Sequence, residues 1–94
     1  MLENVKGFEW DTANIQHIAR HSVMPAEVEE AAQLHHVITG PNNTDGEDRW
    51  ILYGKTARGR YLTVIFTLRQ NRFRSVTAYP MNETDRRKYA PQIG

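Results

Sequence analysis

Residues 49–79, RWILYGKTARGRYLTVIFTLRQNRFRSVTAY, contain three runs rich in β-branched and aromatic residues. The runs cover residues 49–56, 60–68 and 72–79, and only short turns separate them. Connections this short predict an antiparallel meander. In the middle run Leu62, Val64, Phe66 and Leu68 make one wholly apolar face, while the alternate positions are mixed. We therefore predict a central strand that helices cover on one side and leave half open on the other.

The first third of the chain predicts two helices. Asp11 is a favourable N-cap for a helix that runs to about His21, in which apolar residues recur at a spacing of three. Pro25 suits the first turn of a second helix, PAEVEEAAQL, over residues 25–34.

The remaining segments complete the predicted fold. Residues 5–10 predict a short strand or an extended entry segment, and residues 35–39 a short strand. Residues 40–48 (GPNNTDGED) predict a loop, and residues 82–90 a last helix that Asn82 caps. The resulting order is β-α-α-β-β-β-β-α, which indicates an α+β fold with helices on one face of a small antiparallel sheet of about four to five strands. Two helices are N-terminal and one is C-terminal. We expect residues 1–94 to form one domain, because neither half alone could build a core.

Composition narrows the classes of protein. The chain has 94 residues and no cysteine, which excludes disulfides, thiolate zinc sites and cysteine nucleophiles. No apolar run approaches the roughly 20 residues of a membrane span. The start, MLENVKGFEW, lacks the basic and apolar regions of a signal peptide. We therefore expect a cytoplasmic protein that does not bind membranes.

Charge is divided unevenly along the chain. Residues 1–48 hold two cations and nine anions, whereas residues 49–94 hold ten cations and two anions. Nine of the twelve cations are arginine, whose forked guanidinium suits phosphate. The basic half predicts either an anionic partner or neutralisation by the acidic half across the fold.

Three blocks of sequence suggest a family. The first is FEWDTANIQHIARHSVMPAEVEEA (residues 8–31), the second GKTARGRYLTVIF (54–66) and the third RFRSVTAYPMNETDRRKY (72–89). In their order and spacing they resemble the BrnT family, the toxin half of bacterial type II toxin–antitoxin pairs. That family begins with FEWD and a helix ending in a basic-His pair, continues with a Gly-Arg … Gly-Arg hairpin, and closes with an Arg-rich strand and helix.

The resemblance implies a fold, an activity and partners. It implies a RelE-like fold and a ribonuclease that stops translation. It also implies neutralisation by a BrnA-like antitoxin of the ribbon-helix-helix class, in a complex that represses its own operon, and homodimerisation of the toxin is a further expectation. Two positions depart from the family. Tyr79 stands where the strand commonly ends in arginine, which removes a cation from the expected site, and Asp85 stands where a glutamate precedes the two arginines.

RNA can be cleaved without a metal or cofactor by a few side chains, and we expect that here. A base takes the proton of the 2′-hydroxyl, an acid protonates the leaving 5′-oxygen, and cations stabilise the charge that develops on the phosphate. Histidine and tyrosine can move protons, and aromatic rings can hold unstacked bases. His17 and His21 are four residues apart, but two histidines without a third ligand do not define a zinc site.

The predicted catalytic residues are His21, Arg74, Tyr79 and Arg86. For His21 the alternative is an ordinary helix end, since histidine and arginine both favour the C-terminal dipole. Tyr79 would move a proton or stack on a base in place of the missing arginine. Asp11 is interpreted as a helix cap, and Glu9 is a candidate general base.

Further cations are predicted to bind RNA phosphates: Arg20, Lys55, Arg58, Arg60, Arg72 and Arg87. Arg58 and Arg60 belong to one predicted hairpin, and Arg72 and Arg74 to the next. One sheet face could therefore gather two or three guanidinium groups. The alternative is that these arginines are solvated and protect strand edges from aggregation.

Two functions thus remain after the sequence alone. The first is an endoribonuclease toxin. The second is a catalytically inactive module that only binds an antitoxin-like partner or nucleic acid, and Tyr79 favours this second function.

Overall fold

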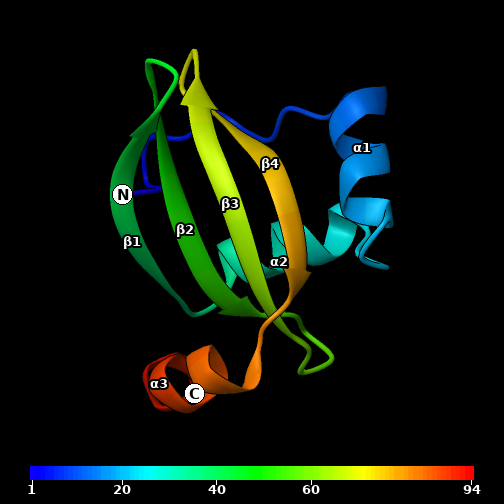
Figure 1. Cartoon of the computed structure of the whole chain (residues 1–94), viewed down its shortest axis with the longest axis vertical. Coiled ribbons are helices and arrows are strands. Elements are labelled where there is room, and N and C mark those ends of the chain that lie inside the picture. Colours follow the sequence, from blue (N-terminus) through cyan, green and yellow to red (C-terminus); the bar gives the residue numbers. More distant parts are fainter.

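A computed structural model describes residues 1–94 as a four-stranded antiparallel sheet with three helices. The strands are β1 (His36–Thr44), β2 (Glu47–Lys55), β3 (Tyr61–Arg69) and β4 (Arg72–Pro80), paired in the order β1-β2-β3-β4 (Figure 1). The helices are α1 (Thr12–Ala19), α2 (Pro25–Gln33) and α3 (Glu83–Ile93). The predicted α+β fold and the meander of three strands are confirmed.

Local sequence explains where the helices begin. The Asp11 side chain accepts a hydrogen bond from the Asn14 amide, and the Asn14 side chain accepts one from the Asp11 amide. This reciprocal capping box fixes the start of α1. The Asn82 side chain caps α3 by accepting a hydrogen bond from the Asp85 amide. The helix α3 continues past the predicted end at residue 90, because Ile93 is buried and fixes the last turn.

The prediction of a loop over residues 40–48 is wrong. These residues belong to a hairpin in which β1 and β2 join through Asp45 and Gly46, both with positive φ, 52° and 80°. Asp-Gly is the preferred pair for such a two-residue turn. Gly40 (φ 111°) and Pro41 lie at an irregularity in the pairing on the edge strand, which is where a sheet accepts proline.

The predicted strand over residues 5–10 is also not formed. This segment runs beside β4 and makes one isolated parallel bridge, from Phe8 to Phe73. The amide of Phe73 donates to the carbonyl oxygen of Gly7, and the Phe73 carbonyl oxygen accepts from the amide of Glu9. Gly7 has φ 150°, so the extended conformation is interrupted after a few residues.

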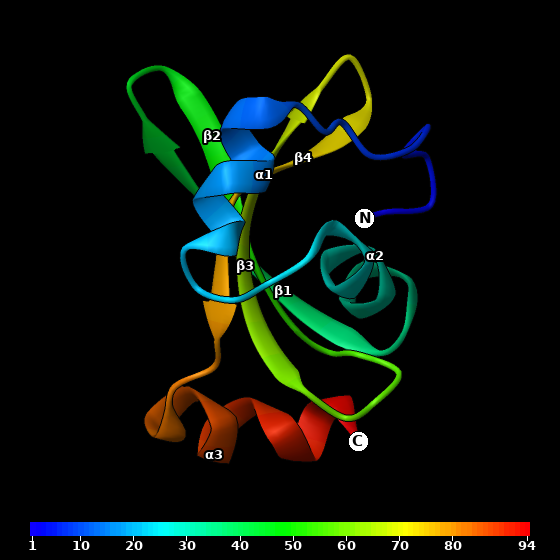
Figure 2. The same cartoon turned by 90° about the vertical axis from the view of Figure 1, so that its right-hand side faces the viewer.

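Helices cover both faces of the sheet, not the single face predicted. On one face α2 packs against Leu52, Leu62 and Val64, all fully buried (Figure 2). On the opposite face α3 buries Tyr89 and Ile93 against Tyr53. The helix α1 lies along the outer edge of β4 and contributes the fully buried Ile18 to the α2 side (Figure 2). Between α1 and α3, part of the sheet face opposite α2 therefore has no helix over it.

Candidate functional site

The uncovered part of the sheet face opposite α2 is called the open face below, and it is turned toward the viewer in Figure 1. Strand pairing sets its rows. Tyr53, Thr63 and Tyr79 lie directly across from one another, and so do Ile51, Ile65 and Thr77. Side chains on one strand alternate between faces, so the two rows point the same way. The side chains that point to the side of the open face are those of Glu47, Arg49, Ile51, Tyr53, Tyr61, Thr63, Ile65, Thr67, Arg69, Arg72, Arg74, Thr77 and Tyr79. Among them Tyr53 packs under α3, and Thr63 and Thr67 are buried.

A β-bulge in β4 brings Arg74 onto the open face. Ile65 pairs with Thr77 and Phe66 pairs with Ser75, so Val76 is an extra residue without a partner. Because the alternation is interrupted there, Arg74 points the same way as Thr77 although their numbers differ in parity. The bulge thus places Arg74 beside Thr67 on the open face.

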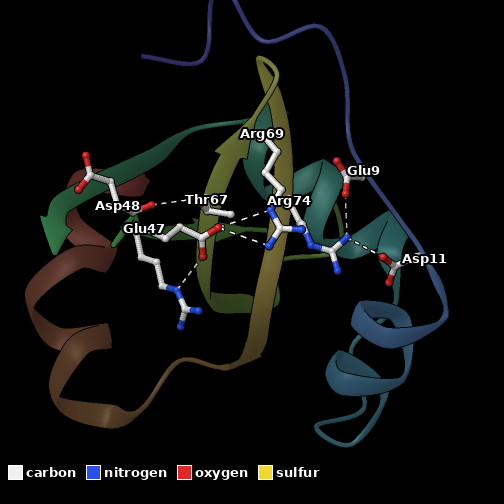
Figure 3. Close-up of polar contacts among 8 residues, drawn as sticks. Glu9, Asp11, Glu47, Asp48, Thr67, Arg69 and Arg74 are labelled. Carbon is white, nitrogen blue, oxygen red and sulfur yellow. Dashed lines mark hydrogen bonds and ion pairs between the residues drawn. The ribbon is translucent and has the colours of Figure 1, made fainter. Parts of the chain in front are cut away.

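The Arg74 guanidinium is clamped by two carboxylates. One of its terminal nitrogens lies 2.8 Å from Asp11 Oδ2 and 3.0 Å from Glu9 Oε1, and only 13% of the side chain is exposed (Figure 3). The hydrogen bond from Arg74 lowers the pKa of Asp11 below its ordinary value. The same bond with Asp11 raises the pKa of Arg74. Two negative charges therefore offset this one cation, and Glu9 is committed to an ion pair.

The other residues of the FEWD segment fix the same part of the chain. Phe8 packs on Phe73 with ring centroids 5.2 Å apart. Trp10 Nε1 donates to Glu29 on α2 at 2.8 Å. Together with the Arg74 clamp, these contacts tie the N-terminal segment to both β4 and α2, which makes FEWD a structural motif.

A second group of charges lies next to Arg74, at the β1–β2 end of the open face. Arg49 Nε lies 3.3 Å from Glu47 Oε2, and Arg69 NH2 lies 3.4 Å from Glu47 Oε1 (Figure 3). Arg49, Arg69 and Arg74 line an open hollow of about 180 Å³. The helix α1 closes one side of this hollow with Asn14 and His17.

A histidine–tyrosine pair lies further along β4. The rings of His21 and Tyr79 meet edge to face, with centroids 5.8 Å apart. His21 is exposed and Tyr79 half-buried, so both can be reached from the open face. Beside Tyr79, the Thr63 hydroxyl is buried and has no hydrogen-bond partner.

Aromatic and cationic side chains surround the junction with α3. The Arg86 guanidinium lies 4.9 Å from the centre of the Tyr61 ring, and Lys55 Nζ lies 5.5 Å from it. Tyr53 stacks on Tyr89 at 3.9 Å between centroids. Burial raises the pKa of the Tyr53 phenol to about 12, with a smaller contribution from the Asp85 carboxylate. Tyr53 is thus a neutral packing residue at physiological pH.

A family model, described as the ribonuclease toxin BrnT of type II toxin–antitoxin systems, matches residues 10–85. This match covers most of the 94 residues. The chain belongs to the BrnT family. No curated protein that was compared with the chain matches it.

The BrnT-family fold brings some of the predicted site residues together and separates others. His21 contacts Tyr79, and Arg86 lies on α3 at the same end of the open face. Arg74 is five residues from Tyr79 along β4, a span of about 15 Å in an extended strand. The four predicted catalytic residues therefore do not form one contact cluster.

The predicted phosphate-binding residues are dispersed. Arg60 donates to Glu27 at 2.9 Å and to the Ser22 carbonyl oxygen at 2.8 Å, which joins β3 to α2. Arg58 is exposed in the β2–β3 turn, whereas Arg72 is exposed at the opposite end of the sheet, beside the β3–β4 turn. The four hairpin arginines, Arg58, Arg60, Arg72 and Arg74, are thus not gathered on one face. Of the others, Arg20 ends α1, Lys55 donates to the Gly94 carbonyl oxygen, and Arg87 pairs with Glu83 on α3.

Arg49, Arg69 and Glu47 are not among the site residues predicted from the sequence. A signal was present, since residues 47 and 49 are in phase with Ile51, and residue 69 is in phase with Ile65. The pairing of Ile51 with Ile65 puts both sets on one face.

No group of three or more His, Asp or Glu side chains is placed to share a metal ion. None of the three helices is long and apolar enough to cross a membrane.

Proposed function

We propose that this BrnT-family chain is a metal-independent endoribonuclease that inhibits translation by cleaving RNA. The observation that carries the proposal is the contact between the exposed His21 and the half-buried Tyr79 on the sheet face opposite α2. An imidazole and a phenol side by side can take and give the two protons that cleavage by the 2′-hydroxyl requires. Family membership supplies the substrate class.

In this proposal the reacting phosphate lies over Tyr79. His21 accepts the proton of the 2′-hydroxyl as its oxygen attacks phosphorus, and Tyr79 donates a proton to the leaving 5′-oxygen. Arg86, on the adjacent end of α3, stabilises the negative charge that develops on the phosphate oxygens. Arg74 is a positioning residue, because Glu9 and Asp11 engage its guanidinium and hold the N-terminal segment in place.

RNA outside the reacting nucleotide would meet the remaining cations. We propose Arg20, Lys55, Arg58, Arg72 and Arg87 as contacts for the RNA backbone. Arg60 is assigned a structural role instead, since Glu27 and Ser22 already bind its guanidinium.

One experiment tests the activity directly. Induction of the chain in bacteria should arrest growth, and His21→Ala or Tyr79→Phe should relieve the arrest while the protein stays folded. His35→Ala is the matched control, because His35 is also exposed but lies outside the open face. Cleavage of RNA by the purified chain should persist in EDTA. Loss of cleavage in EDTA would contradict metal independence, and full arrest by both His21→Ala and Tyr79→Phe would contradict the site.

A second candidate function is a catalytically inactive module that binds only a partner or nucleic acid. The observation in its favour is the small number of cations near the His21–Tyr79 pair. Residue 79 is itself uncharged, and Arg74, offset by two carboxylates, lies about 15 Å away along β4. Under this alternative the wild-type chain binds RNA without cleaving it. Tyr79→Arg would then produce cleavage that the wild-type chain lacks.

The family implies an antitoxin partner. We propose a BrnA-like ribbon-helix-helix antitoxin, together with a RelE-like fold, a cytoplasmic location and a toxin homodimer within the complex. Co-expression with the product of an adjacent ribbon-helix-helix gene should rescue growth, and light scattering of the purified complex should give its stoichiometry. Rescue failure with a soluble, co-expressed antitoxin would contradict the partner assignment.

A further inference from the structure

A second anion site lies at the β1–β2 end of the open face, away from His21 and Tyr79. We infer that Arg49 and Arg69 form a phosphodiester-binding subsite and that the Glu47 carboxylate occupies it in the free chain. The identity of the ligand as RNA rests on the proposed function.

The two arginines share one carboxylate, one on each oxygen. Arg49 Nε is 3.3 Å from Oε2 of Glu47, and both Nε and NH2 of Arg69 are 3.4 Å from Oε1. The two non-bridging oxygens of a phosphodiester offer a similar pair of acceptors with one negative charge. Glu47 therefore stands in the position that a phosphate group would take.

This carboxylate is held more loosely than those of the structural ion pairs. The contacts of Arg74 with Asp11 and of Arg60 with Glu27 measure 2.8 and 2.9 Å, within the usual charge-assisted range. The Arg69 side chain is 53% exposed, whereas that of Arg74 is 13% exposed. The Glu47 and Arg49 side chains are 28% and 33% exposed, and long, partly solvated ion pairs contribute little to stability. An incoming phosphate can thus displace Glu47 with little loss to the fold.

The hollow that Arg49 and Arg69 line also includes the exposed His17. Asn14 and Ser75 line it as well, but both are buried and their side chains are already hydrogen-bonded within the chain. Arg74 lies at the same hollow, but Glu9 and Asp11 engage it. Displacement of Glu47 therefore releases two unpaired guanidinium groups at this point of the surface.

The subsite is separate from the proposed reaction centre. Arg74, which borders the hollow, is about 15 Å along β4 from Tyr79. We therefore assign the subsite to a phosphate flanking the one that reacts, so that Arg49 and Arg69 orient the RNA strand and touch none of the reacting atoms.

The test measures binding of a fluorescent 2′-O-methyl oligoribonucleotide, which cannot be cleaved through the 2′-hydroxyl, by anisotropy at several salt concentrations. Arg49→Ala and Arg69→Ala should each weaken binding about tenfold. Each should also lower the slope of log K against log salt by about 0.7, the value for one lost phosphate contact on a single strand. Glu47→Gln should tighten binding about threefold, because the competing carboxylate is gone.

Glu3→Gln is the matched control. Glu3 also pairs with a cation, the N-terminal amine at 2.6 Å, but it is 81% exposed and does not line the hollow. Its removal changes the net charge equally and should leave binding nearly unchanged. Thermal unfolding of every variant checks that the fold is intact.

The outcomes separate the subsite from the proposed function. Equal tightening by Glu47→Gln and Glu3→Gln would reduce the effect to net charge and overturn the subsite. Arg49→Ala and Arg69→Ala variants with unchanged affinity and slope would also overturn it. If the variants behave as expected but wild-type protein does not cleave ordinary RNA, the subsite stands and the proposed catalysis fails. If wild-type protein cleaves RNA while the variants bind normally, the catalysis stands and the subsite fails.

Discussion

Gly54 lies where β2 packs directly against α2, and replacing it with alanine should destabilise the fold. A Cβ atom at Gly54 would lie 2.8 Å from the Ala31 carbonyl oxygen, 3.0 Å from Leu52 Cδ2 and 3.1 Å from Ala31 Cβ. The nearest of these atoms belongs to helix backbone, so no side-chain rotation relieves the contact. The helix and strand must therefore move apart by several tenths of an ångström.

The loss of folding stability in Gly54→Ala follows from the packing. Forcing a methyl group into a filled core typically costs 1–3 kcal/mol, and we expect about 2 kcal/mol for Gly54→Ala. In a chain of this size that lowers the Tm by about 10 °C. Thermal unfolding followed by far-UV circular dichroism measures the shift.

A second variant tests the stated cause. Ala31→Gly removes the Ala31 Cβ but leaves its carbonyl oxygen, so the double variant Gly54→Ala/Ala31→Gly should not regain the wild-type Tm. Recovery in the double variant would assign the clash to the side chain, and a Tm of Gly54→Ala within about 2 °C of wild type would refute the close approach itself. Gly54 lies in the GKTARGR segment. Because Gly54→Ala lowers the stability of the fold, it should also weaken growth arrest in bacteria.

Three further predictions concern single contacts. Arg74 lowers the pKa of Asp11 in the folded chain, so the stabilisation is present above the unfolded value of 3.8 and is lost as the pH falls through the lower folded value. Asp11→Asn should therefore lower the urea midpoint at neutral pH and make no difference in strong acid. The folded pKa of Tyr53 is about 12 against 10.0 unfolded, so stability should decline as the pH rises above about 10, and Tyr53→Phe should reduce that decline. Arg60→Met should lower the free energy of unfolding by about 1 kcal/mol, while Arg58→Met, at an exposed turn, should leave it unchanged in the same denaturant titration.

The β1–β2 hairpin shows where local patterns mislead. Residues 40–48 are rich in turn formers, and such composition is typical of a loop. Only Asp45 and Gly46 form the turn, and the residues before them extend an edge strand. An edge strand accepts Pro41 because its outward amide needs no ladder partner. Pairing with β2 therefore overrode a local preference.

In the candidate site, too, some features could be predicted from the sequence and others could not. The sequence determined the three C-terminal strands, the helix caps at Asp11 and Asn82 and the composition of the family motifs, because alternation and capping depend on near neighbours along the chain. His21 could also be proposed from its place at the end of the first helix.

Only the tertiary structure decided which charges meet. Arg49 and Arg69 share Glu47 because β2 and β3 pair in one particular register, and Arg74 reaches the open face because a bulge at Val76 interrupts the alternation. Register, bulges and helix placement depend on contacts between distant segments. Alternation along a strand shows which residues share a face, but not which strands pair or in which register.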